Sequence, residues 1–319
     1  MNDDCSGNNK IGGIDGKFEG KANPNPPCLC KTMYDSGLFK TEDLVIENVE
    51  TWIDLIKEHL YSKGYEHAVA TLDKMLDYNE GLKRKDGKTP SIVHELTQLT
   101  WLISCLDDGL IVENPEGVII NDIAHDLGED HGMKPYFLIK LLLAYQPVED
   151  KDTLTEIKAA HGVLSKDYLG EESEKIPTET LFKLIAASQN ASIVKILDRI
   201  HNISTHIGVK TAEKSASYVK STREKFIPAI REISTELFLN QTEIYDMLLE
   251  VLEATCALTE MHYKQNHMPT NDTLRSLMPE AGFKDLPDGL NPFLVIANRS
   301  RATRNEQTPS TDNSSDLSQ

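Results

Sequence analysis

The chain has 319 residues, of which 39% are hydrophobic, so it is long enough to bury one sizeable core. Its 33 basic and 51 acidic residues give a formal net charge of −18. This charge argues against binding to DNA, RNA or an anionic membrane, because phosphate groups attract positive surfaces. No apolar run approaches the roughly 18 residues of a membrane span, and the polar N-terminus lacks a signal-peptide pattern. We therefore expect a soluble, acidic, cytoplasmic protein.

The composition of the two ends predicts poorly ordered tails. Residues 1–40 are rich in Gly, Asn, Pro and Asp, and residues 299–319 are rich in Ser, Thr and Asn. Cys28 and Cys30 lie in the first tail with too few neighbouring ligands for zinc, so we interpret them as free thiols. The five cysteines are scattered and odd in number, which does not indicate a disulfide framework.

Between the tails, hydrophobic periodicity predicts helices almost throughout. In 44–60 the apolar residues recur at intervals of three and four, the pattern of an amphipathic helix. Similar patterns predict helices at 65–78, 92–106, 117–127, 134–144, 152–165, 178–187, 190–204 and, as several helices, 212–262. Strand-like alternation is scarce, and 267–296 has the composition of an irregular cover segment. The sequence therefore predicts an all-α fold.

The first segment with chemical interest is a basic loop that leads into a helix. Lys83, Arg84, Lys85 and Lys88 form a positive cluster in an acidic protein, and His94 follows in the first turn of the predicted helix. A local reversal of charge is what binding a small polyanion requires. A solvated basic loop without a ligand is the alternative.

The second segment is an apolar helical run that ends in His125 and Asp126, followed by Glu129 and Asp130. Together with Asp122, two of these carboxylates follow a spacing of four, at which like charges destabilise a helix. Acidic residues also suit the N-terminus of a helix rather than its C-terminus. A bound cation would remove the repulsion, so this segment is a candidate metal site, and a solvated acidic turn is the alternative.

The third segment places a cation, a carboxylate and an amide on one helix face. Lys195 precedes Asp198 by three residues, and Asn202 follows it by four. Taken alone, such a segment is more often a salt-bridged helix end than a site. We expect its other two polar residues, Arg199 and His201, to be structural and to bond neighbouring helices.

Together the three segments supply His94, His125, Asp126 and Asp198, in the order H…HD…D. Two imidazoles and two carboxylates suit a divalent ion such as Mn²⁺ in roughly octahedral geometry. Such a ligand set leaves coordination positions for water and for a phosphate oxygen.

The three motifs resemble those of the HD-domain phosphohydrolases, in particular the hydrolase domain of the RelA/SpoT family and the related small alarmone hydrolases. That family has R-K-x-G-x-P-Y-x-x-H, H-D-x-x-E-D and K-L-A-D-R-x-H-N; this chain has R-K-D-G-K-T-P-S-I-V-H at 84–94, H-D-L-G-E-D at 125–130 and K-I-L-D-R-I-H-N at 195–202. The resemblance covers about residues 65–235. One residue is inserted before the first histidine, and Ser91 stands where the family has an aromatic residue.

The resemblance implies an HD-domain helical bundle over 41–235, followed by a C-terminal helical extension at 236–298. It implies a Mn²⁺-dependent hydrolase that removes pyrophosphate from the 3′ position of guanosine tetra- or pentaphosphate, a phosphorylated purine nucleotide. The implied metal ligands are His94, His125, Asp126 and Asp198, and the implied catalytic residues, which activate water, are Glu129 and Asp130. The implied substrate-binding residues are Arg84 and Lys85, beside the base, and Lys195 and Asn202, near the metal.

Two other functions stay open at the level of the sequence. Ser91 leaves room for another 2′- or 3′-phosphorylated nucleotide, or NADPH, as the substrate. A non-catalytic protein that senses a nucleotide or binds a partner is the third hypothesis, against which the Glu129–Asp130 pair argues because binding alone needs no water activator. The helices beyond residue 235 are where we expect a partner or a second copy of the chain to dock.

Overall fold

The computed structural model describes residues 49–84, 87, 89–107, 109–131, 134–145, 151–165, 176–205 and 210–265. Of this part, 84% is helical and none is strand, which confirms the predicted all-α fold. The predicted tails, 1–40 and 299–319, and the cover segment, 267–296, lie outside the described residues.

The helices follow the predicted order along the chain. Their bounds are α3 (Val49–Ser62), α4 (Glu66–Asn79), α5 (Val93–Asp107), α6 (Pro115–His131), α7 (Pro135–Tyr145), α8 (Lys151–Leu164), α9 (Thr178–Ala186), α10 (Gln189–Ser204), α11 (Ala212–Ser221), α12 (Ile227–Ala229), α13 (Thr235–Leu237) and α14 (Thr242–Gln265). Two π-helical turns, Thr222–Phe226 and Ile230–Ser234, continue α11 through α12 to α13. Within the described residues, no helix is long and apolar enough to cross a membrane.

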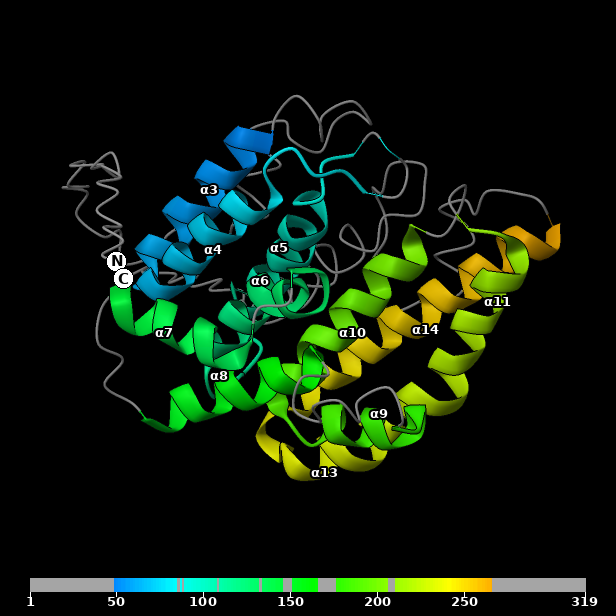
Figure 1. Cartoon of the computed structure of the whole chain (residues 1–319). Helices are drawn as coiled ribbons and strands as arrows, with labels where there is room; N and C mark the ends of the chain where they lie inside the picture. The colour runs from blue at the N-terminus through cyan, green and yellow to red at the C-terminus, as the bar shows by residue number, and fades with distance from the viewer. Residues whose placement is uncertain are drawn as a thin grey trace, which may run out of the picture.

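Helix α6 lies at the centre of the bundle and packs against α4, α5, α8 and α10 (Figure 1). Its apolar residues Ile119, Ile123 and Leu127 follow at intervals of four and are fully buried. Helix α10 also packs against α14, so α14, the last described helix, shares one continuous hydrophobic core with the rest of the described chain. Each fully buried Ile or Leu contributes about 1.5–3 kcal/mol, which makes this core the main stabilising element.

A chain of buried amides fixes how α10 lies against α6 and α8. The Nδ2 of Asn190 on α10 donates to Oδ1 of Asn121 on α6 at 2.8 Å. The Nδ2 of Asn121 in turn donates to the carbonyl oxygen of Ile157 on α8 at 3.0 Å. Because buried polar groups need partners, sliding α10 along α6 would break the first bond, and the second bond holds α6 against α8. The amides therefore set the register that brings Asp198, two turns after Asn190, level with His125, one turn after Asn121.

A short hairpin-like loop joins α4 to α5. The N–H of Ser91 donates to the carbonyl oxygen of Leu82 at 3.0 Å, and the N–H of Arg84 donates to the carbonyl oxygen of Thr89 at 2.8 Å. The turn between them needs a φ of +71° at Gly87, a left-handed conformation that glycine adopts without steric cost. The loop thus returns directly into α5 and holds Arg84 close to the first turn of that helix.

Candidate metal centre

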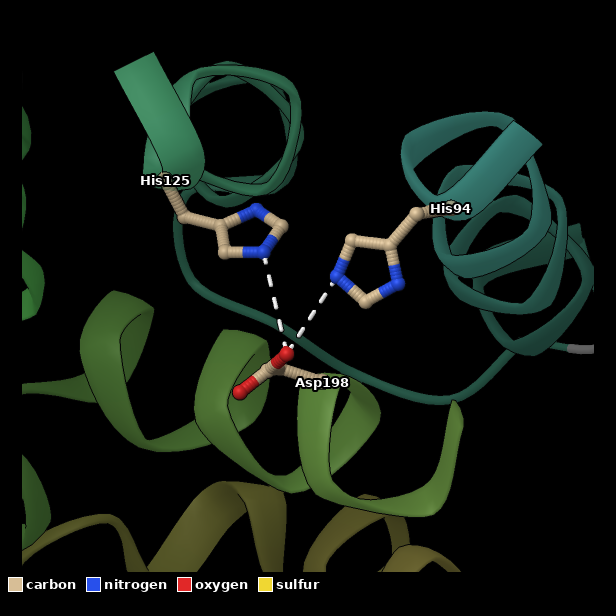
Figure 2. Close-up of side chains that lie close together, drawn as sticks. All are labelled: His94, His125 and Asp198. Atoms are coloured by element: carbon tan, nitrogen blue, oxygen red, sulfur yellow. Dashed lines mark ion pairs between the residues drawn. The ribbon is translucent and has the colours of Figure 1, made fainter. Parts of the chain in front are cut away.

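Three helices direct one side chain each to a common point. His94 from α5, His125 from α6 and Asp198 from α10 are buried and offer ligand atoms that lie within 4.8 Å of one another, a group that could hold a metal ion. The Oδ1 atom of Asp198 lies 3.3 Å from Nε2 of His94 and 3.9 Å from Nε2 of His125. Figure 2 shows one nitrogen of each imidazole directed at this carboxylate oxygen.

Asp126, the fourth predicted ligand, lies beside the same two imidazoles. Its Oδ1 is 3.1 Å from Nε2 of His125, and its Oδ2 is 3.6 Å from Nε2 of His94. The structure therefore brings together all four residues that the H…HD…D order singled out. Asp126 is the most exposed of them, with 22% of its side chain accessible, which leaves this side of the cluster open to solvent and to a ligand.

The hydrogen bond of His125 defines which of its nitrogens is available. The Nδ1 atom lies 2.6 Å from the backbone carbonyl oxygen of Asp122. A carbonyl oxygen only accepts, so Nδ1 carries a proton, and Nε2 is the nitrogen that faces the carboxylates and could bind an ion. That Nε2 is buried and forms no hydrogen bond with any residue that the structure describes. The carboxylates around Nε2 favour a positive charge there, either a proton on the imidazole or a cation that takes its place.

The charges around the cluster oppose the effects of burial. Burial lowers the pKa of His125, but the carboxylates of Asp126, Asp198 and Asp122 outweigh it and raise the pKa to about 9. Burial raises the pKa of Asp198, but Lys195 and His94 outweigh it and hold the pKa well below its usual range. The ionised Asp198 and the positive charge favoured on His125 therefore lie together in a buried place, where a divalent cation could replace the proton of the imidazole.

Two of the predicted substrate-binding residues contact Asp198 directly. The Nζ of Lys195 lies 2.7 Å from its Oδ2, and the Nδ2 of Asn202 donates to its Oδ1 at 2.5 Å. Arg84 lies close enough for its positive charge to act on the pKa of both Glu95 and His201, two residues of the site. The loop thus carries a cation to the edge of the cluster.

The remaining predicted residues fall on the undescribed part. Lys85 and Lys88 lie outside the described residues. Glu129 and Asp130 belong to the last turn of α6, one turn beyond Asp126, but their side chains lie outside the described part.

Sequence reasoning missed Glu95, a carboxyl group at the centre. Burial and the charge of Asp126 raise its pKa to about 8, and its Oε2 has no hydrogen-bond partner in the described part of the chain. Asp122, noted for its spacing but not proposed as a site residue, is fully buried, and burial raises its pKa to about 8. The available signal for Glu95 was its place directly after His94 in a helix whose neighbours Val93 and Leu96 are core residues.

Arg199 and His201 bond neighbouring helices, as expected. The Arg199 guanidinium lies 4.5–4.9 Å from the ring centroids of three aromatic residues and donates to Oγ1 of Thr222 at 2.6 Å. The Nδ1 of His201 lies 2.7 Å from Nδ1 of His94 on α5. Burial and the neighbouring charges of His94 and Arg84 hold the pKa of His201 well below its usual range, so its ring is neutral.

Comparisons of this chain with protein-family models, with curated proteins and with solved structures give no match. The chemistry of the centre therefore rests on its residues. Two imidazole nitrogens and two carboxylates are ligands for Mn²⁺ and similar divalent ions, and they leave positions for further oxygen ligands. Among the described residues, Nε2 of His125 and carboxyl oxygens of Asp122 and Glu95 form no hydrogen bond, which fits such an ion better than it fits a purely structural cluster.

Proposed function

We propose that this protein is a metal-dependent phosphohydrolase of the HD-domain class. The observation that carries the proposal is the meeting of His94, His125, Asp126 and Asp198 at one buried point. These four side chains would hold a divalent ion, for which Mn²⁺ is the proposed identity. When bound, such an ion polarises a phosphoryl oxygen and lowers the pKa of a bound water.

The proposed reaction is removal of pyrophosphate from the 3′ position of guanosine tetraphosphate or pentaphosphate. Water attacks the phosphorus attached to the ribose 3′ oxygen, the bond between that phosphorus and that oxygen breaks, and the products are GDP or GTP and pyrophosphate. The support is the resemblance of the three motifs at 84–94, 125–130 and 195–202 to those of alarmone hydrolases.

Each flanking residue has a part in this reaction. Glu129 and Asp130 orient the attacking water and accept its proton, since they follow Asp126 by one helical turn. Arg84, at the edge of the cluster, attracts the phosphates and stacks on the base. Lys195 balances the charge of Asp198, so the carboxylate stays ionised.

A second candidate function keeps the reaction class and changes the substrate. Ser91 begins the turn into α5 where the resembling family has an aromatic residue, and this position lies between Arg84 and His94 in the chain. A smaller side chain there enlarges the space beside the base, which favours another 2′- or 3′-phosphorylated nucleotide, such as NADPH.

The test is turnover of a substrate panel with Mn²⁺ present, followed by chromatography of the products. The panel contains guanosine tetraphosphate, NADPH, an adenosine 3′-phosphate and a generic phosphoester. We expect GDP and pyrophosphate from guanosine tetraphosphate, and no turnover after chelation of the metal. Asp198→Asn should abolish turnover, whereas Asp77→Asn, the same change at an exposed position of α4, should not.

The other outcomes of the panel decide between the remaining hypotheses. Preferred turnover of NADPH or of the adenosine nucleotide would replace the proposed substrate and keep the class. Tight binding of a nucleotide without turnover of any member would establish the non-catalytic alternative and overturn the proposed hydrolase.

A further inference from the structure

His94 and His201 make an unusually direct contact between two imidazoles. Their Nδ1 atoms lie 2.7 Å apart, and the ring centroids lie 4.5 Å apart in an edge-to-face arrangement. Both side chains are almost fully buried. Two protonated nitrogens, or two lone pairs, would repel each other at this distance, so one ring donates and the other accepts.

The direction of this hydrogen bond decides whether His94 can bind a metal. If Nδ1–H of His94 donates, the neutral ring carries its lone pair on Nε2, the atom 3.3 Å from Asp198. If His201 donates instead, the Nε2 of His94 carries a proton and can only form a hydrogen bond to that carboxylate. Only the first arrangement offers a metal ligand at the cluster.

We propose that His201 is a positioning residue of the metal centre, which accepts a hydrogen bond from Nδ1–H of His94 and thereby presents the Nε2 lone pair to the ion. This inference rests on the proposed metal site. His125 is oriented in the same way, because its Nδ1 donates to the carbonyl oxygen of Asp122. The two imidazole ligands would thus each have a dedicated acceptor behind them, a backbone carbonyl for one and an imidazole for the other.

The neighbours of His94 support this assignment of roles. The amide nitrogen of Gln98 lies 2.7 Å from Nε2 and 3.2 Å from Nδ1 of His94, but an amide N–H only donates and cannot take the proton of Nδ1. Trp101 packs beside the ring of His201 at a centroid distance of 5.9 Å and holds it in place. Among the described residues, the Nδ1 of His201 is therefore the acceptor that lies within hydrogen-bond distance of Nδ1–H of His94.

The test compares His201→Asn with His201→Leu, two side chains of nearly the same shape. Both remove the ring, but only Asn keeps an acceptor near the position of Nδ1. Titration of the metal-free protein with Mn²⁺, by calorimetry or by electron paramagnetic resonance, gives the affinity. We expect the Leu variant to bind Mn²⁺ about 10–100-fold more weakly than the wild type, the usual effect of losing such a partner, and the Asn variant to recover most of the loss.

A structural role predicts the opposite order, because Leu suits a buried site better than Asn does. Equal losses in the two variants, or an unchanged affinity in the Leu variant, would therefore overturn the inference while leaving the metal site intact. Wild-type protein whose Mn²⁺ binding is absent, or is unaffected by Asp198→Asn, would overturn the proposed function as well.

A second measurement needs no variant and so does not depend on whether the variants fold. The ¹⁵N chemical shifts of the His94 ring report which nitrogen is protonated, and Zn²⁺ serves as a diamagnetic probe in place of Mn²⁺. We expect a protonated Nδ1 and a metal-bound Nε2 in the loaded protein. Metal bound to Nδ1 would overturn the inference.

Discussion

Glu95 and Asp122 add two carboxyl groups to a cluster that already contains Asp126 and Asp198. Burial raises the pKa of both added groups to about 8, so near neutral pH the metal-free protein keeps them largely protonated. A group whose pKa is higher in the folded than in the unfolded state binds an extra proton on folding between the two values. The stability that it contributes is therefore present at low pH and is lost as the pH rises.

Glu95→Gln should flatten this pH dependence in the metal-free protein. The ordinary pKa of the group is 4.5 and its folded value is about 8, so the free energy of unfolding of the wild type should fall across this window. Gln keeps the shape of the side chain and cannot ionise. Denaturant unfolding in the presence of a chelator, between pH 5 and pH 8.5, measures the slope. An unchanged slope in the variant would show that Glu95 titrates outside this window.

Glu129→Gln and Asp130→Asn should each lower the turnover rate by about a hundredfold or more, the usual scale of losing a general base. Neither residue belongs to the proposed ligand set, so Mn²⁺ affinity should stay near that of the wild type. Turnover and metal titration on the same preparations test both parts. Loss of metal together with activity would make these residues ligands or structural groups instead.

Arg84→Ala should raise KM several-fold more for guanosine tetraphosphate than for a generic phosphoester, with a smaller change in kcat. Part of the attraction is screened charge, so the salt dependence of KM should also become weaker. Lys83→Ala is a matched control, because it removes the same charge from the same loop. The Lys83 side chain itself lines a separate pocket beside α3 and α4. Equal effects of the two variants would reduce the role of Arg84 to general attraction.

At the scale of elements, α10 links the candidate site to α6 on one side and to α14 on the other. It carries Asp198, packs against α6 and α14, and begins with Ser188 accepting a hydrogen bond from the N–H of Ala191. Almost every residue of this helix is buried, including its polar ones. Its polar side chains therefore need partners on other helices, and these partners determine where α10 lies.

Asn190→Ala should destabilise the fold by about 1–3 kcal/mol, because it leaves the buried Oδ1 of Asn121 without its donor. Asn240→Ala, the same change at an exposed position before α14, should alter stability by less than about 0.5 kcal/mol. Denaturant unfolding of both variants gives the comparison. A similar small effect of the two changes would show that the amide chain does not fix α10.

The sequence predicted the elements well because each helix carries its own periodic apolar face. The helix expected at 92–106 is found at Val93–Asp107, and the one expected at 117–127 extends to Pro115–His131. The spacing of three and four also placed Lys195, Asp198 and Asn202 in contact. Local patterns contain no information about pairs between helices, so the contact of His201 with His94 could not be predicted.

The burial of the Glu95 carboxyl group could not be predicted from the sequence either. A glutamate within a helix is ordinarily exposed, and only the packing of neighbouring helices makes this one buried. Its nearness to Asp126 and to Arg84 depends on how α6 and the loop before α5 pack against α5, which the periodicity of α5 does not reveal. Which carboxyl groups face the centre is thus a property of the assembled bundle.

At the scale of the whole molecule, Mn²⁺ should raise the unfolding temperature of the protein. An ion that binds only the folded state adds about 2.7 kcal/mol of stability at a concentration a hundred times its dissociation constant. Thermal unfolding with increasing Mn²⁺ measures the shift, and Asp198→Asn should remove most of it. A shift of the same size in that variant would locate the stabilising ion elsewhere on this acidic chain.

The positions of the proposed metal ligands along the chain imply that folding would precede metal binding. His94, His125 and Asp198 come from three helices, and their partners His201 and Asp122 lie on two of the same helices. No short segment of the unfolded chain holds the complete set, so α5, α6 and α10 must assemble before a strong site exists. An ion bound at the proposed site would therefore bind to the assembled bundle and would not nucleate its folding. The main kinetic effect of such an ion would be to slow unfolding of the bundle, with little effect on the rate of folding.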